Sequence, residues 1–233
     1  TLSLKKVLDR FSPDFHPVVP FNPATDNLLL LDFSASNKDL SPHILNSTKD
    51  FAAYINDRLQ DAGALYGIGG YAEHRTVYEM SNLFDADTAG GEPRRLHLGV
   101  DIWGKPNTHV MAPLDGIVHS FAFNKGTGDY GATLVLTHQL EGITFHTLYG
   151  HLSLASIANM REGARVQAGE VFGGFGIPAE NGGWPPHLHF QVISDLGTCK
   201  GDYPGVCRYS EKESYLQNCP DPDIILQLNR YTG

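Results

Sequence analysis

The chain of 233 residues contains no apolar run long enough to cross a bilayer as a helix, which takes about 18 residues. The longest such run, "NLLLLDF" at 27–33, has the length of a strand. Basic residues are also scarce, since 17 Lys and Arg stand against 26 Asp and Glu, for a net charge of −9. We therefore expect no membrane span. We also expect no nucleic-acid partner, because such a partner favours a basic face.

Cysteine is rare, and its spacing excludes a Cys-x-x-Cys zinc site. Cys199, Cys207 and Cys219 are the three present, and the pattern favours free, buried thiols. A Cys199–Cys207 disulfide in an oxidising compartment is the alternative. The opening "TLSLKKVLDRF" lacks the apolar centre of a signal peptide and has the pattern of an amphipathic helix. The sequence leaves export, and hence the compartment, open.

Glycine and proline are abundant, at 25 and 14 residues, and they indicate many turns and a β-rich fold. The helix, strand and turn signals change along the chain and divide it into three regions. These are a mixed, partly helical extension at 1–85, a β-domain at 86–196 and a loop-rich tail at 197–233. We predict a mainly β protein, α+β overall. The β-domain is expected to be an antiparallel two-sheet sandwich or barrel-like sheet pair.

Several local elements can be assigned from sequence signals. Ser47 is the expected N-cap of a helix that Gly63 ends. Asp115-Gly116 and Glu141-Gly142 each predict the turn of a β-hairpin. Asp221-Pro222 is a candidate start for a short helix in the tail.

The stretch "PPHLHFQV" has the pattern of a strand with histidines at two alternate positions. Residues i and i+2 of a strand face the same side, so His187 and His189 lie side by side, about 7 Å apart along the strand. In "RRLHLGVDIWG", His97 and Asp101 are also evenly spaced. Imidazole and carboxylate ligands suit zinc, and three protein ligands leave a position for water. His97, Asp101 and one histidine of the pair predict such a site.

These motifs, together with "TLYGHLS" around His151, resemble the lysostaphin/LytM-type zinc endopeptidases, metallopeptidase family twenty-three. "APLDGIV" at 112–118 and "EGARVQAGEVFGGFG" at 162–176 extend the resemblance over about 100 residues. It implies that His97, Asp101 and His189 bind one Zn²⁺ ion. It also implies that His151 and His187 are catalytic histidines. The implied substrates are peptidoglycan stem or cross-bridge peptides, or other Gly- or Ala-rich peptides.

A narrower resemblance concerns "ENGGWPPHLHFQVISDL" and the tail. Both look like the peptidase-like segment of fusions with a kinase-like domain and a class III aminotransferase. The broad family implies a periplasmic or extracellular location, whereas the narrower resemblance implies a cytoplasmic one.

The chain also departs from the family pattern around the expected groove. Gln191 stands where a glutamate is frequent, and Trp184 and Asn181 are expected to reshape the substrate groove. His146, on the strand leading to His151, and Tyr78 are further groove candidates. His74 and Arg75 lie near Tyr78 in the sequence, and this trio is either a polar edge of the fold or a substrate-facing wall.

Two other functions fit parts of the sequence. "VMAPLDGIV" and "VQAGEVFGG" look like pieces of a lipoyl- or biotin-type carrier, but no lysine occupies the tight hairpin that such a carrier needs. The second alternative is a catalytically silent or latent member of the same fold that acts as a binding or regulatory module, with its groove covered by the N-terminal region. The sequence leaves the oligomeric state open.

Overall fold

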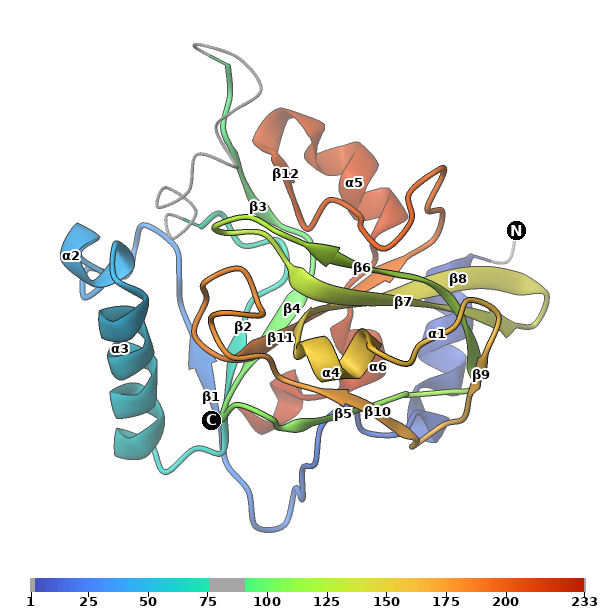
Figure 1. Cartoon of the computed structure of the whole chain (residues 1–233), viewed down its shortest axis with the longest axis horizontal. Coiled ribbons are helices and arrows are strands. Elements are labelled where there is room, and N and C mark those ends of the chain that lie inside the picture. Colours follow the sequence, from blue (N-terminus) through green and yellow to red (C-terminus); the bar gives the residue numbers. More distant parts are fainter. Residues whose placement is uncertain (1–2, 76–90, 233) are drawn as a thin grey trace.

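The computed structural model describes residues 3–75 and 91–232, and an eight-stranded sheet runs through its centre (Figure 1). The strand order is β1-β2-β4-β11-β8-β7-β6-β9. The first two strands are parallel and all other neighbours are antiparallel, so the sheet is mixed. The bounds are Leu28–Leu31 (β1), Tyr66–Gly69 (β2), Val100–Trp103 (β4), Gly116–Asn124 (β6), Gly131–Leu140 (β7), Ile143–Leu152 (β8), Arg165–Val166 (β9) and His187–Ile193 (β11).

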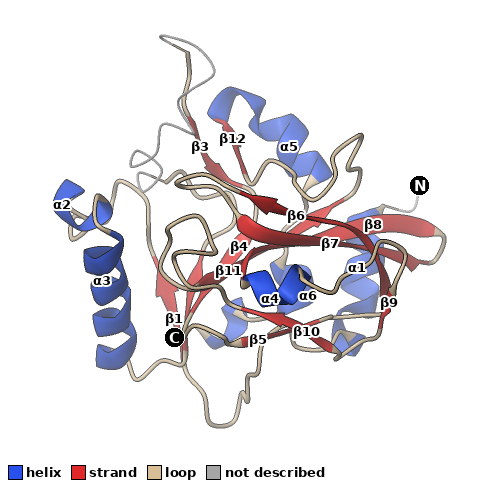
Figure 2. Cartoon of the chain, viewed as in Figure 1, coloured by secondary structure: helices blue, strands red, loops and turns tan. Residues whose placement is uncertain are grey.

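Two small sheets accompany the large one. In the first, β5 (His109–Met111) pairs with β10 (Val171–Gly174), and in the second β3 (Arg94–His97) pairs with β12 (Val206–Arg208) (Figure 2). The mainly β class is thus confirmed, but the two-sheet sandwich is not. Within the described residues the large sheet is open, with β1 and β9 at its ends. The segments 104–108 and 175–186 flank the β5–β10 pair and contain Pro and Gly, which interrupt strand pairing. The β5–β10 sheet therefore stays small.

Six α-helices and three short 3₁₀ helices are described around the sheets. The α-helices are α1 (Leu4–Phe11), α2 (Pro42–Leu45), α3 (Thr48–Asp61), α4 (Leu154–Ile157), α5 (Lys212–Asn218) and α6 (Asp223–Leu226). The 3₁₀ helices are Ser12–Asp14, Tyr209–Glu211 and Asn229–Tyr231. Of the helices described here, none is both long and apolar enough to span a bilayer. All three cysteines are free thiols; Cys207 and Cys219 are buried and Cys199 is partly exposed.

One of the two predicted hairpins forms. β7 and β8 pair as far as Leu140 and Ile143, and Glu141 and Gly142 between them both have positive φ, as the tight turn requires. The hairpin predicted at Asp115-Gly116 is wrong. β5 pairs with β10, whereas β6 pairs with β7 and β9. Pro113 has no N–H for a ladder, and its carbonyl accepts from the backbone of His16 instead.

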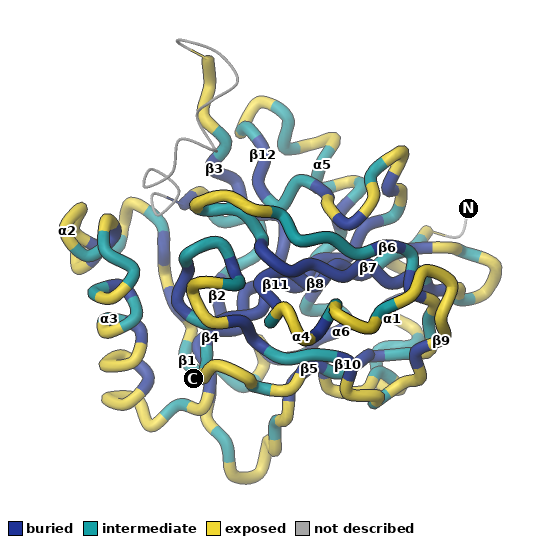
Figure 3. Tube along the Cα trace, viewed as in Figure 1, coloured by how far each residue is buried: buried dark blue, intermediate teal, exposed yellow. Residues whose placement is uncertain are grey.

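Strand alternation separates the core from the polar face of the central strand β11. Leu188, Phe190 and Val192 belong to the main hydrophobic core, and burying each contributes about 1.5–3 kcal/mol. His187 and His189 alternate with them and therefore share the opposite face, as predicted. Figure 3 shows that β11 and the adjacent strands are buried along most of their length. The histidine pair thus lies deep in the protein, where each ring requires polar partners.

The N-terminal region forms the helices that its sequence predicts. α1 buries Val7 and Leu8, and in α3 the Ser47 side chain accepts from the Asp50 backbone while Gly63 follows the helix with φ of +56°. α6 follows Asp221-Pro222 in the tail, also as predicted.

The same N-terminal region is joined to the β-domain. It supplies β1 and β2 to the large sheet, and α3 lies beside them (Figure 1). The rings of Phe33, Phe51 and Trp103 pack with centroids 5.3–5.7 Å apart, which ties α3 to β4. The boundary predicted at 85/86 lies outside the described residues, so the division into three regions stays a prediction.

Candidate metal centre

Two neighbouring strands bring the candidate ligands together. β11 lies between β4 and β8, with His189 opposite Asp101 on one side and Gly150 on the other. His97 ends β3, and two residues separate it from the start of β4. Gly99 between these strands is required, because a Cβ there would lie 2.6 Å from the His189 ring and 2.8 Å from the Phe190 carbonyl oxygen.

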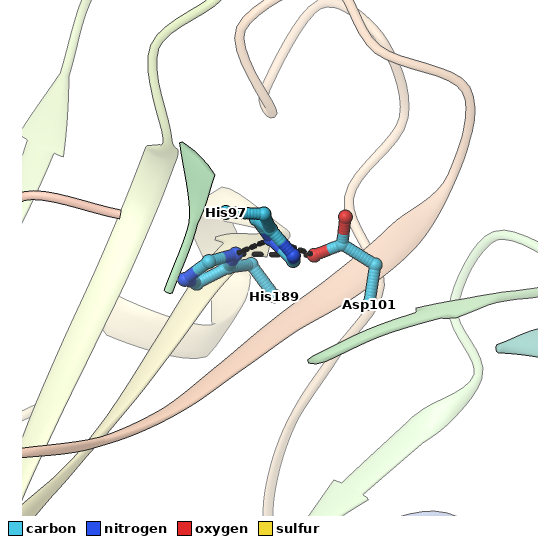
Figure 4. Close-up of side chains that lie close together, drawn as sticks. All are labelled: His97, Asp101 and His189. Atoms are coloured by element: carbon cyan, nitrogen blue, oxygen red, sulfur yellow. Dashed lines mark hydrogen bonds and ion pairs between the residues drawn. The ribbon is translucent and has the colours of Figure 1, made fainter. Parts of the chain in front are cut away.

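The three candidate ligand atoms form a nearly equilateral triangle (Figure 4). His97 Nε2 lies 3.0 Å from His189 Nδ1, and Asp101 Oδ1 lies 3.2 Å from the former and 3.0 Å from the latter. A tetrahedral zinc ion with bonds of about 2.0–2.1 Å separates its ligand atoms by about 3.3–3.4 Å. The observed triangle is only slightly tighter, so His97, Asp101 and His189 could bind a metal ion.

Hydrogen bonds behind the ligands orient both imidazoles. His97 Nδ1 lies 2.9 Å from the Gly70 carbonyl, which can only accept, so Nδ1 carries the proton and Nε2 presents its lone pair. Gln191 Nε2 donates to the Pro204 carbonyl, which turns Gln191 Oε1 towards His189 Nε2 at 2.8 Å. His189 therefore donates from Nε2 and presents the lone pair of Nδ1. Two nitrogen lone pairs and a carboxylate oxygen converge, and a cation between them would remove their repulsion.

Burial and charge favour the ligand forms of these side chains. Burial, followed by the charge of Arg75, lowers the pKa of His97 to about 4, so the ring is neutral at pH 7. Burial by itself would raise the pKa of Asp101. The interactions with His97, the charge of Arg75 and the hydrogen bond from His189 outweigh this effect and hold the pKa well below its ordinary value. His97 is therefore neutral and Asp101 ionised, the forms in which these side chains bind a metal ion.

His151 and His187 form a second pair next to this triangle. Their ring centroids are 4.1 Å apart, and each Nδ1 lies 2.8 Å from a backbone carbonyl, that of Asn181 for His151 and that of Pro185 for His187. Nε2 is thus the basic nitrogen of each ring. Burial lowers the pKa of His187 to about 4, and burial and the neighbouring histidines lower the pKa of His151 well below its ordinary value. Both imidazoles are neutral at pH 7.

The His151 backbone is unusual for a strand residue. Its φ is +61°, a left-handed conformation that costs free energy in a residue with a side chain. Two backbone hydrogen bonds hold it there, from His151 N to the Tyr130 carbonyl and from Gly176 N to the His151 carbonyl, both 2.9 Å long. This twist at the end of β8 directs the ring of His151 towards β11.

The two sets of histidines meet at one cavity of about 180 Å³. His151, His187, His189 and Asp101 line it, together with the aromatic rings of Trp103, Tyr130 and Trp184 and the charged side chains of Arg75, Arg94, Asp129 and Asp202. The N-terminal region and the tail both contribute to these walls. The cavity therefore offers a ligand aromatic surfaces and charges of both signs beside the imidazoles.

The predicted groove residues have different positions. Trp184 lines the cavity, and Asn181 is fully buried, with its side-chain amide bonded to the Trp184 backbone in both directions. Asn181 thus positions Trp184 and, through its carbonyl, His151. His146 does not line the cavity; its Nδ1 lies 2.9 Å from the Thr137 hydroxyl. Tyr78 lies outside the described residues.

Sequence reasoning missed most of the contacts behind the ligands. Arg75 was singled out only as part of a polar trio, yet it is 1% exposed and pairs with Asp101. Trp103 stacks on His187 with ring centroids 3.8 Å apart. Tyr130 Oη lies 3.4 Å from His189 Nε2. No spacing signal marks these residues, because each reaches the site from a different segment of the chain.

Comparison with known proteins supports the family resemblance. Residues 95–200, which contain all five histidine and aspartate candidates, match the model of peptidase family M23. The L-Ala–D-Glu endopeptidase of Bacillus subtilis (strain 168) is 29% identical over 128 residues, which cover 53% of this chain and 37% of that protein. The chain thus spans little more than a third of the curated relative that it matches.

The chain is also similar to solved structures of peptidases. The catalytic domain of the antimicrobial peptidase lysostaphin from Staphylococcus simulans aligns with 76% of this chain and 97% of its own, at 23% identity and a TM-score of 0.44. A zinc containing peptidase from Vibrio cholerae aligns with 42% of this chain and 27% of its own, at 26% identity and a TM-score of 0.34.

Proposed function

We propose that this chain is a zinc-dependent metalloendopeptidase in which His97, Asp101 and His189 hold one Zn²⁺ ion. The observation that carries the proposal is the convergence of two imidazole lone pairs and a carboxylate oxygen, 3.0–3.2 Å apart, beside two further neutral imidazoles. The match of residues 95–200 to peptidase family M23 supports the same reaction class.

The chemistry divides between the ion and the side chains. When bound, zinc in such a three-ligand site lowers the pKa of a water towards about 7 and polarises a peptide carbonyl. His151 and His187 face the same cavity as neutral bases. Nε2 of either ring can accept the proton that the attacking water releases and return it to the leaving amine. While it carries that proton, it can also donate a hydrogen bond to the oxygen of the tetrahedral intermediate. We assign these roles to the two histidines jointly.

We infer a peptidoglycan-type or other Gly- or Ala-rich peptide as the substrate. The support is the similarity to a protein named L-Ala–D-Glu endopeptidase. The narrower resemblance to the peptidase-like segment of aminotransferase fusions points instead to a peptide outside the cell wall. Because both substrates contain the same scissile group, the proposed reaction at the metal is common to them.

The decisive experiment combines metal analysis with digestion of peptidoglycan and short Gly/Ala peptides, followed by mass spectrometry of the products. We expect about one zinc ion per chain and new peptide termini with the unmodified protein. His189→Ala should lose both, whereas His146→Ala, a substitution outside the cavity, should retain both. No metal in the unmodified protein would overturn the proposal. Bound metal without cleavage of any peptide would favour the silent binding module.

A further inference from the structure

The segment 70–75 of the N-terminal region contacts two of the three metal-ligand candidates. The Gly70 carbonyl faces His97 Nδ1, and the backbones of Ala72 and Glu73 pair with the backbone of His97 at 2.9 Å in each direction. Arg75 then reaches Asp101 with its side chain. A region that the sequence predicts to be an extension thus supports the centre directly.

Arg75 contacts one oxygen of the Asp101 carboxylate, and the two histidines contact the other. Its Nη1 lies 2.5 Å from Asp101 Oδ2, while Oδ1 faces the nitrogens of His97 and His189 at 3.2 and 3.0 Å. A carboxylate can bind a metal ion through one oxygen or through both. The contact with Arg75 occupies the oxygen that binding through both would require.

The surroundings of Arg75 hold its side chain in this position. Its Nε lies 2.7 Å from Glu73 Oε2, and its guanidinium carbon lies 5.3 Å from the centre of the Phe33 ring. Gly69 makes room for it, since a Cβ there would lie 2.6 Å from Arg75 Nη2. The side chain is 1% exposed, so two carboxylates, an aromatic face and a glycine gap define its conformation.

Arginine has a chemical reason to occupy this position. Its planar fork places Nε on Glu73 and Nη1 on Asp101 at the same time, which the single nitrogen of a lysine cannot reproduce with the same directions. A side chain that only neutralised a buried carboxylate would not need two fixed contacts. The arrangement is that of a group that orients a metal ligand.

We propose that Arg75 is a positioning residue of the metal centre, which holds Asp101 as a ligand through Oδ1 alone. This inference rests on the proposed function. It assigns the N-terminal region a part in building the centre, in addition to supplying two strands of the large sheet. Residues in such a role typically change metal affinity or activity about 10- to 100-fold when they are replaced.

The test compares Arg75→Gln and Arg75→Lys with Arg58→Gln, a matched change at an exposed position on α3. Zinc affinity is measured by competition with a chelator, ligand geometry by the visible absorption of the cobalt(II)-loaded protein, and stability by thermal unfolding of the metal-free protein. We expect about 10- to 100-fold weaker zinc binding and an altered cobalt spectrum for Arg75→Gln. The changes should be smaller for Arg75→Lys and absent for Arg58→Gln.

The outcomes separate the two proposals. If Arg75→Gln binds zinc like the unmodified protein and gives the same cobalt spectrum, Arg75 is only structural, even if the metal-free variant melts earlier. If Arg75→Gln does not fold, the same measurements are made on Arg75→Lys and Glu73→Gln. Unchanged zinc affinity and unchanged cobalt spectra in both variants would overturn the inference. An unmodified protein that binds neither zinc nor cobalt would overturn the proposed function and this inference together.

Discussion

Two groups of buried or half-buried histidines lie in the β-rich part of the molecule, and their ring nitrogens meet different partners. The first group consists of the site histidines His97, His151, His187 and His189, and the second of the β6–β8 histidines His119, His138 and His146. In the second group the ring nitrogens form hydrogen bonds with hydroxyls or a backbone carbonyl. His138, for example, lies between the Asp115 carbonyl and the Thr147 hydroxyl, at 2.8 and 2.7 Å.

The difference shows what turns a histidine cluster into a candidate metal centre. His119 and His146 also have neighbouring rings, with centroids 5.4 Å apart, but their Nδ1 atoms face Ser120 and Thr137. A hydroxyl can donate to one nitrogen or accept from another, so it satisfies either form of the ring. Only in the first group do two nitrogen lone pairs meet an ionised carboxylate, within the residues that the structure describes. Convergence, and not burial alone, distinguishes the site.

The largest effect is expected from Asp101→Asn. The substitution removes the charge of the candidate ligand and breaks its ion pair with Arg75, so zinc binding and peptide cleavage should both be lost. The metal-free protein should also lose about 3 kcal/mol of unfolding free energy, because a buried ion pair is broken. Metal analysis, a cleavage assay and denaturant unfolding measure the three effects. Thr137→Val, which removes the hydroxyl beside His146, is the matched change in the other group and should retain metal and cleavage.

A smaller and more selective effect is expected from His151→Ala. The ring lies beside the ligand triangle but contributes no atom to it, so the variant should keep its zinc while cleavage falls about 10²- to 10⁴-fold. Zinc content and product formation over time are compared with those of His119→Ala, which should cleave normally. Loss of zinc together with activity in His151→Ala would mean that this histidine is a ligand and not a base.

The smallest effect on function is expected at His138, which lies outside the cavity and influences stability and its pH dependence. Burial lowers the pKa of this ring to about 4 from the ordinary value of 6.5, so between these values the unfolded chain binds a proton that the folded protein excludes. The free energy of unfolding must therefore fall as the pH drops from about 6.5 to about 4, with a contribution from His138 of about 3 kcal/mol.

Replacing His138 tests this contribution in the metal-free protein. In His138→Gln the fall in unfolding free energy across the same pH window should be about 3 kcal/mol smaller than in the unmodified protein. Denaturant unfolding at several pH values measures it, with His109→Gln, at an exposed position on β5, as the control. An unchanged pH dependence in His138→Gln would contradict the claim that burial of the His138 ring lowers stability at acidic pH.

Much of the local structure could be predicted because it depends on neighbouring residues. The Ser47 cap, the Glu141-Gly142 turn and the shared face of His187 and His189 follow from backbone geometry within a few residues. The hairpin predicted at Asp115-Gly116 does not form, although its turn signal is equally strong. There the partner strand was decided by distant segments, through the pairing of β5 with β10 and the contact of Pro113 with His16.

The site shows the same division. By itself the sequence determined which side chains alternate on each strand, and hence that an imidazole pair and a His–Asp pair would each face one side. Only the tertiary structure decided that β4, β8 and β11 lie side by side, that Gln191 and Gly70 select the lone pairs that converge, and that Arg75 meets Asp101. The physical reason is the sequence distance over which each feature is determined. Alternation is a local property of the extended backbone. The partners of a buried charge come from segments far apart in the chain, which only packing brings together.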